Sequence, residues 1–181
     1  MNLESLNLAE RQLLFRVEQV IGLMEEKHEQ LQQNGVFRDY GEIYEAYVAL
    51  IGSESEGLEA LKRATFLMWY EQAEPACFSG VFRLSEKINR KVLESLERRC
   101  EAGRLDFELE WMLPYYNMIA DWVFSRYADL PHLQSFLAKS DFKLYERVPV
   151  KAEDFTNRGQ LGEYWLSIIN SNATRFGKGA I

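Results

Sequence analysis

The sequence is short of the residues that build metal centres and disulfide frameworks. Its 181 residues include two cysteines, two histidines and four prolines. Cys77 and Cys100 are too few for a disulfide framework or a cysteine-rich zinc site, so we expect two free thiols. Helical di-metal enzymes use a Glu-x-x-His pair twice, together with glutamates from other helices, which this chain does not offer. We therefore expect no disulfide, no metal and no other cofactor.

Long apolar runs and signs of export are also lacking. The main apolar stretch, residues 66–70, is far shorter than the roughly 20 residues that a membrane-spanning helix needs. The N-terminal residues do not show a basic segment followed by an apolar one, as a secretory signal would. Together with the free thiols, these features predict a cytoplasmic protein that does not enter a membrane.

Basic charge is scarce in relation to acidic charge. The chain has 28 acidic and 21 basic residues, with a net charge of −7. A general binder of the phosphate backbone needs a basic face, so we exclude nucleic acid as a partner. The excess lies in residues 1–75, which hold 14 acidic and 6 basic residues. Such a surface steers basic partners, and it is also an ordinary route to solubility.

Helical periodicity and aromatic residues are abundant. The length suits one domain, which we place at residues 1–181 with a frayed tail from about residue 172. Apolar residues recur at spacings of three and four, and no convincing pair of strands is present, so the fold class is all-α. Aromatic residues make up 13% of the chain and include four tryptophans. They predict an aromatic-rich core, since each buries a large area.

The periodicity predicts six to seven helices. Asn7 and Glu10 have the spacing of a capping box, and the apolar face that follows includes either Val20 or Ile21, and then Met24. Pro114 should kink or divide the fifth helix near residues 112–113. Residues 75–82 are rich in small residues and are expected to form a buried or half-buried connector. Residues 142–148 alternate weakly, which is compatible with a short extended segment. The helices are expected at about 8–31, 42–51, 55–73, 85–102, 105–127, 131–138 and 158–170.

Two of these helices should form the centre. Residues 64–70 are apolar all round, which is typical of a helix enclosed by others. The aromatic residues concentrate on the third helix (about 55–73) and the fifth (about 105–127). We therefore predict a globular bundle around these two, with a short right-handed superhelix of paired helices as the alternative.

Several carboxylates are candidates for catalysis. Glu71 and Glu74 follow the most buried part of the third helix, where burial can raise a carboxyl pKa. A structural polar junction is the favoured interpretation of both. Asp121 shares a narrow polar stripe of the fifth helix with Glu110 and Asn117. We favour a stripe that faces solvent, because charged groups are rarely buried unpaired.

Cysteine and histidine offer further candidates. Cys77 needs a nearby base to act as a nucleophile, and folding would have to bring His28 or His132 to it. A small buried core cysteine is the favoured interpretation. Glu25 and His28 share a helix face. The favoured interpretation is that His28 closes the apolar stripe of the first helix, with Glu25 in solvent. A mononuclear metal site built on His28, His132 and a carboxylate is the weaker alternative.

Aromatic side chains are the candidates for lining a ligand pocket. Trp69, Trp111 and Trp122, with Asn117, lie on the two central helices and would form its wall. Core packing is the competing interpretation.

The sequence as a whole favours a non-catalytic cytosolic helical domain that binds another protein. The alternative is a helical-bundle enzyme or small-molecule-binding protein that uses carboxylates beside an aromatic-lined pocket. A third hypothesis is a homo-oligomerisation module that pairs through the amphipathic first helix.

Overall fold

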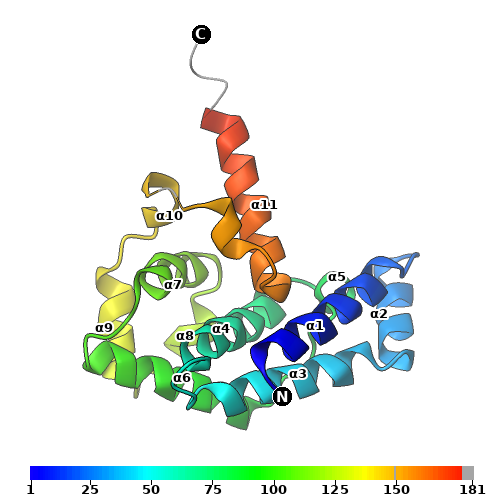
Figure 1. The fold of residues 1–181 in the computed structure, drawn as a ribbon, viewed down its shortest axis with the longest axis horizontal. Helices are drawn as coiled ribbons and strands as arrows, with labels where there is room; N and C mark the ends of the chain where they lie inside the picture. Colours follow the sequence, from blue (N-terminus) through cyan, green and yellow to red (C-terminus); the bar gives the residue numbers. More distant parts are fainter. Residues whose placement is uncertain (149, 177–181) are drawn as a thin grey trace.

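The computed structural model describes residues 1–148 and 150–176, which form helices joined by turns (Figure 1). No strand occurs in these residues, so the all-α prediction is confirmed for them. They contain eleven α-helices and one 3₁₀ helix, more than the six to seven that we predicted. The elements are α1 (Leu3–Glu18), α2 (Met24–Gln33), α3 (Val36–Leu50), α4 (Gly57–Ala73), α5 (Ala76–Ser79), α6 (Glu86–Glu101), α7 (Phe107–Ile119), α8 (Trp122–Ser125), α9 (Pro131–Lys139), α10 (Leu144–Arg147), η1 (Ala152–Phe155) and α11 (Gly159–Phe176).

The first predicted helix is two helices, α1 and α2. Gly22 adopts a φ of +129°, which L-residues rarely reach, and this breaks the helix. Of the two residues that the periodicity offered for the buried face, Val20 lies in the core and Ile21 is exposed, and Met24, which was also expected on that face, is exposed. The helix also begins earlier than expected, because the side chain of Asn2 accepts a hydrogen bond from the amide of Ser5.

The fifth predicted helix divides later than Pro114. α7 continues through this proline to Ile119, and the break comes at Ala120, whose φ of −146° and ψ of 69° are not helical. Proline removes one hydrogen bond, and the burial of its neighbours Leu113 and Tyr115 offsets that loss. Two further short helices were not predicted. α5 lies in residues 75–82, which we expected to be a connector, and α10 lies in residues 142–148, which were compatible with a short extended segment.

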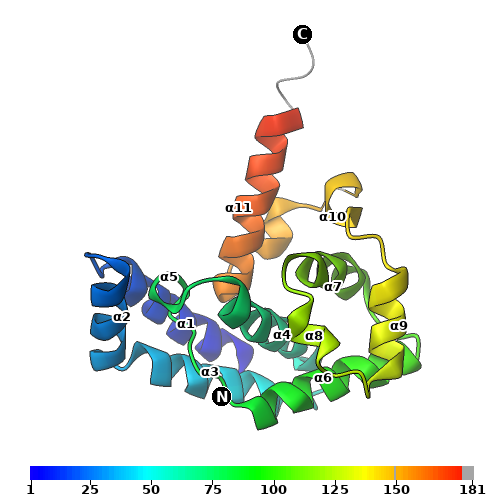
Figure 2. The ribbon, with the colours of Figure 1, turned by 180° about the vertical axis from the view of Figure 1, so that it is seen from behind.

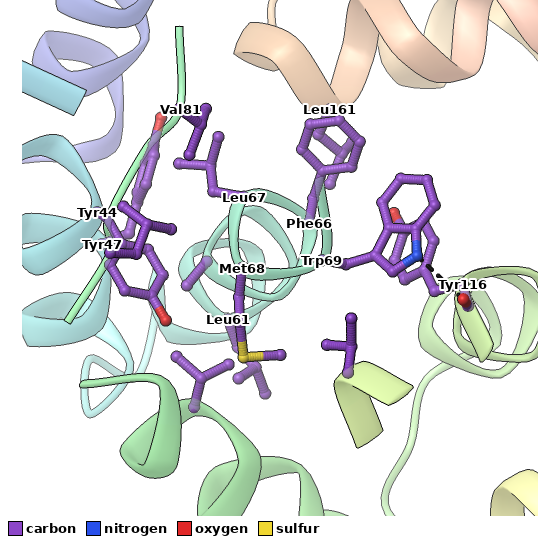
Figure 3. Close-up of a cluster of buried hydrophobic side chains, with 14 of the residues drawn as sticks. Tyr44, Tyr47, Leu61, Phe66, Leu67, Met68, Trp69, Val81, Tyr116 and Leu161 are labelled. Carbon is purple, nitrogen blue, oxygen red and sulfur yellow. Dashed lines mark hydrogen bonds between the residues drawn. The ribbon is translucent and has the colours of Figure 1, made fainter. Parts of the chain in front are cut away.

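The centre of the molecule is α4. Its residues 60–69 are all buried, and Figures 1 and 2 show it between α1 and α3 on one side and α6, α7 and α8 on the other. Figure 3 shows apolar and aromatic side chains around the whole circumference of α4. This is the enclosed third helix that the sequence predicts.

Aromatic rings join α4 to α7 and α11. The rings of Trp69 and Tyr116 stack with centroids 4.5 Å apart, and Trp69 Nε1 donates a hydrogen bond to the carbonyl oxygen of Tyr116 (Figure 3). Trp165 of α11 lies 4.3 Å from the ring of Trp111 and donates to the hydroxyl of Tyr116. The centre predicted from two helices therefore has α11 as a third member.

α11 rises from the centre and points away from the other helices in both views (Figures 1 and 2). Its backbone stays helical to Phe176, beyond the predicted end at about residue 170. The predicted frayed tail from about residue 172 overlaps this helix, and its last part, residues 177–181, lies outside the described residues. None of the described helices is both long and apolar enough to cross a membrane. Cys77 and Cys100 are both free thiols, as predicted.

Candidate functional site

The most polar part of the interior joins α1, α3, α4, α7 and the start of α11. Arg158, which is buried, donates hydrogen bonds to the carboxylates of Glu59 and Glu108. Lys62 also pairs with Glu108, and Arg63 donates to Glu59 Oε1 at 2.7 Å. Each of these buried cations has a carboxylate beside it, so these ion pairs hold α4, α7 and the start of α11 together and leave none of the three cations for a ligand.

The same network encloses Glu10. Its Oε2 accepts a hydrogen bond from the hydroxyl of Tyr47 at 2.7 Å, and its Oε1 accepts one from the amide of Gln160 at 2.9 Å. Burial raises the pKa of Glu10, and these two hydrogen bonds offset only part of that effect. Glu10 therefore fixes the start of α11 and is not the helix-capping residue that its sequence spacing suggested.

Charge pairing around Arg158 keeps its acidic partner ionised. Burial alone would raise the pKa of Glu108, but Arg158 and Lys62 outweigh it, and the pKa lies below its ordinary value. At the neighbouring Gly159, φ is +57° and an added Cβ would lie 2.0 Å from Glu10 Oε2. The network thus depends on a glycine as well as on charges.

The carboxylates proposed for catalysis do not share this network. Glu71 accepts a hydrogen bond from the amide of Leu84 at 2.8 Å, and burial raises its pKa. This contact is the polar junction that we favoured for Glu71.

The other candidate carboxylates lie nearer the surface. Glu74 lies at the end of α4, where burial raises its pKa, and Asp121 is exposed before α8. Glu110 is also exposed and Asn117 is half-buried, so the polar stripe of the fifth helix faces outward.

The aromatic pocket candidates lie in different environments. Trp69 and Trp111 are fully buried in the aromatic core, whereas Trp122 is exposed at the start of α8. Asn117 is half-buried near the end of α7. None of the four lines either of the two hollows described next.

Folding does bring Glu25, His28 and Cys77 together. All three line a hollow of about 410 Å³ between α2 and the turn into α5, which Met24, Glu29, Pro75 and Ala76 also line. The imidazole of His28 lies between two phenyl rings, those of Phe37 and Phe82, with both centroids 4.8 Å away. His28 therefore forms a wall of this hollow that a tilted and an edge-on ring contact hold in place, and Cys77, which also lines the hollow, is almost entirely buried.

Met24 lines this hollow, and three further apolar side chains that neighbour its lining residues in the sequence, Ile21, Leu23 and Phe78, face solvent. Ile21 and Leu23 keep 80% and 70% of their area exposed, and Met24 and Phe78 about half. The ammonium group of Lys27 lies 5.4 Å from the centroid of the Phe78 ring, which joins α2 to α5 across the surface. We call this region the α2–α5 surface; it comprises Ile21, Leu23, Met24, Glu25, Lys27, His28, Glu29 and residues 75–78.

Charge on this surface is acidic. α2 contains Glu25, Glu26 and Glu29 but a single basic residue, Lys27. Glu26 is occupied in part, since its Oε2 accepts a hydrogen bond from the amide of Leu23. Glu25 and Glu29 are exposed beside the hollow and form no ion pair within the described residues. The surface therefore combines exposed apolar groups with unpaired carboxylates.

His132 lies elsewhere, at the start of α9. Its Nδ1 is 2.7 Å from Glu97 Oε1, and it lines a second hollow that Cys100 also borders. Figures 1 and 2 show α2 and α9 at opposite ends of the molecule, so His28 and His132 do not form the joint metal site that we considered. Within the described residues, no group of three or more His, Cys, Asp or Glu side chains is arranged to hold a metal ion.

Sequence reasoning missed the exposed part of the α2–α5 surface. Ile21 and Leu23 flank Gly22, and a glycine within an apolar run is a signal for a break that the helical pattern masked. Phe78 lies in a segment that we expected to be a buried or half-buried connector. No sequence signal marks it as exposed, because its position depends on the packing of α5 against α1 and α2.

Comparisons with known protein families, with curated proteins and with solved structures found no match for this chain.

Proposed function

We propose that this protein is a non-catalytic interaction domain whose α2–α5 surface docks a basic, apolar segment of a partner protein. The observation that carries the proposal is the hollow lined by Met24, together with the exposed Ile21, Leu23 and Phe78 side chains on the segments that form its lining. Contiguous apolar side chains with a polar rim are typical of protein-binding surfaces. Fully burying one exposed side chain of this size contributes about 1.5–3 kcal/mol, and about half of that for Met24 and Phe78, which are already half-buried, so the four together supply part of the free energy of a moderate complex.

Charge complementarity favours a basic partner over a second copy of this chain. Glu25 and Glu29 flank the hollow, and residues 1–75 carry the acidic excess. A symmetric dimer through this surface would bring the same carboxylates of two copies together, which is repulsive. A segment that carries lysine or arginine would instead be attracted before contact and held after it.

The ring of Phe78 offers a specific position for a cation. The ammonium group of Lys27 lies 5.4 Å from the ring centroid, so the ring already attracts a positive charge within this chain, and Phe78 stays 46% exposed. An arginine of the partner would compete with Lys27 for this ring and pair with Glu25 or Glu29. Aromatic groups of this kind are frequent among the residues that dominate binding free energy.

Homo-oligomerisation through the first helix has less support. The inward face of α1, with Leu6, Leu13 and Val17, packs against α3 and the other helices of the same chain. That face is used within the fold and is not available to a second copy.

The enzyme hypothesis also has less support. Glu71 holds a backbone amide, Asp121 is exposed before α8, and neither lines the hollow that contains His28 and Cys77. We place the interaction in the cytosol, where the thiols of Cys77 and Cys100 stay reduced.

The experiment is an NMR titration of the ¹⁵N-labelled protein with a synthetic amphipathic helix of leucine and lysine. We expect amide shifts concentrated at residues 21–29 and 76–78, and these shifts should be saturable and weaker at high salt. The matched control is the same peptide with glutamate in place of lysine, which should cause no such shifts.

A second exposed apolar group serves as an internal comparison. Met118, Ile119 and Trp122 are exposed around the α7–α8 turn, and the indole N–H of Trp122 gives a separate NMR signal. Shifts at Trp122 in place of the α2–α5 surface, or equal shifts with both peptides, would overturn the proposal. Self-association of the free protein through α2 would also contradict the proposal, because the surface would then bind a second copy of this chain and not a basic partner.

A further inference from the structure

A second hollow lies at the opposite end of the molecule, between the end of α6, the start of α7, and α9. Its volume is about 390 Å³, within the range of sites that hold small organic molecules. The side chains that matter for recognition are Leu105 and Phe136, which are apolar, and Glu110, His132 and Lys139, which are polar. We call it the α6–α9 hollow.

The imidazole of His132 has a fixed orientation. Glu97 Oε1 contacts Nδ1 at 2.7 Å, and the same carboxylate accepts hydrogen bonds from the amides of His132 and Leu133. Burial raises the pKa of Glu97, but the Leu133 and His132 contacts outweigh it, and the pKa lies below its ordinary value. The ionised carboxylate of Glu97 is a hydrogen-bond acceptor, so Nδ1 of His132 carries a proton, and Nε2 is an acceptor whenever the ring is neutral.

Two charges of opposite sign remain unpaired at this hollow. Glu110 of α7 and Lys139 of α9 are both exposed, and neither forms an ion pair within the described residues. His132 and Lys139 are seven residues apart on α9, about 10 Å along the helix axis. The flexible side chain of Lys139 spans part of that distance, which suits a ligand with a cationic and an anionic end.

The rest of the lining is apolar and unreactive. Leu105 and Phe136 are half-buried, and both pack against the core. Burial and the charge of Glu97 raise the pKa of Cys100 to about 11, so its thiol stays protonated and acts as an apolar wall. A ligand with an apolar side chain would lie against these three residues.

We propose that the α6–α9 hollow binds a small zwitterion with an apolar side chain, of the free amino acid or dipeptide class. Glu110 and Nε2 of His132 receive the ammonium group, Lys139 receives the carboxylate, and Leu105 and Phe136 contact the side chain. This site is independent of the α2–α5 surface, and either proposal can fail without the other.

The test uses the imidazole Cε1–H signals of the full-length protein in ¹H–¹³C NMR spectra. The chain has two histidines, so His28 is an internal control, and His132→Gln assigns the signals. L-leucine and glycyl-L-leucine should each shift the His132 signal saturably while the His28 signal stays in place. N-acetyl-L-leucine, which lacks the ammonium group, and L-leucinamide, which lacks the carboxylate, should bind at least about tenfold more weakly.

Two matched variants separate recognition from folding. Glu110→Gln should weaken leucine binding and leave the weak binding of N-acetyl-L-leucine unchanged, whereas Glu25→Gln, in the other hollow, should affect neither. Both side chains are exposed, so both variants fold. The proposal would be overturned if leucine bound no more tightly than N-acetyl-L-leucine and L-leucinamide, or if the two variants had the same effect on binding. It would also be overturned if neither zwitterion shifted the His132 signal.

Discussion

The centre of the molecule and the α2–α5 surface both depart from the rule that charges lie outside and apolar side chains inside. At the centre, Arg63 and Arg158 are buried, yet each has a carboxylate of the same chain beside it. At the α2–α5 surface, Ile21 and Leu23 are exposed, and no part of the described chain covers them.

The difference separates a structural role from a functional one. A buried charge that is paired within the chain is already compensated, so it specifies the packing of helices and needs no partner. An exposed apolar side chain beside a hollow is not compensated until another molecule covers it. The contrast predicts that changes at the centre alter stability, while changes at the surface alter binding.

The largest effect on stability is expected from Arg158→Ala. The substitution leaves Glu59 and Glu108 with one cation fewer in a buried site, which costs about 3–5 kcal/mol in the free energy of unfolding. Urea denaturation followed by circular dichroism measures it. The control is Arg38→Ala, an exposed arginine with a paired carboxylate, which should leave the urea midpoint near that of the wild type. Equal effects of the two substitutions would contradict the structural role of the centre.

Glu10→Gln gives a smaller effect that depends on pH. Burial raises the pKa of Glu10 above its ordinary value of 4.5. A carboxyl with a raised folded-state pKa stabilises the fold fully below its unfolded-state pKa, and this contribution is lost as pH rises through the folded value. Glutamine does not titrate, so the free energy of unfolding should shift in favour of the variant as the pH rises above 4.5, the ordinary pKa of glutamate.

The same urea experiment at several pH values tests this. Tyr47, Arg63 and Glu59, which face Glu10, are present in both proteins, so their contributions largely cancel in the difference. A difference that is independent of pH, or that shifts in favour of the wild type as pH rises, would show that the pKa of Glu10 is not raised.

The smallest effect on stability is expected from Phe78→Ser. This side chain is 46% exposed, so its replacement should change the free energy of unfolding by less than about 1 kcal/mol. Thermal unfolding of Phe78→Ser beside Phe142→Ser checks it, since Phe142 is equally exposed and also has a lysine over its ring. A loss as large as that of Arg158→Ala would mean that Phe78 belongs to the core and does not form a docking surface.

Much of the fold can be predicted from the sequence because it depends on local patterns. The enclosed helix α4 follows from the apolar run at residues 64–70, and the start of α9 follows from Pro131 at its first position. The break at Gly22 and the uninterrupted course of α7 past Pro114 were not predicted. In both cases, helix propensity competes with tertiary packing, which the periodicity of one segment does not contain.

The candidate site was predictable only in part. Glu25, His28 and Cys77 were each singled out, but their meeting in one hollow depends on how α5 packs against α2. The central network joins Glu10 to Gln160, 150 residues apart, and no spacing rule links such positions. The exposure of Phe78 likewise depends on contacts between distant segments.

The most direct test of the docking surface is the affinity of the leucine–lysine peptide for Phe78→Ser and for Phe142→Ser, measured by fluorescence anisotropy beside the wild type. The two phenylalanines match in exposure and in their neighbouring lysine, and they differ in that Phe78 belongs to the α2–α5 surface. We expect Phe78→Ser to weaken binding by about tenfold or more and Phe142→Ser to leave it unchanged. Equal affinities of the two variants would contradict the account.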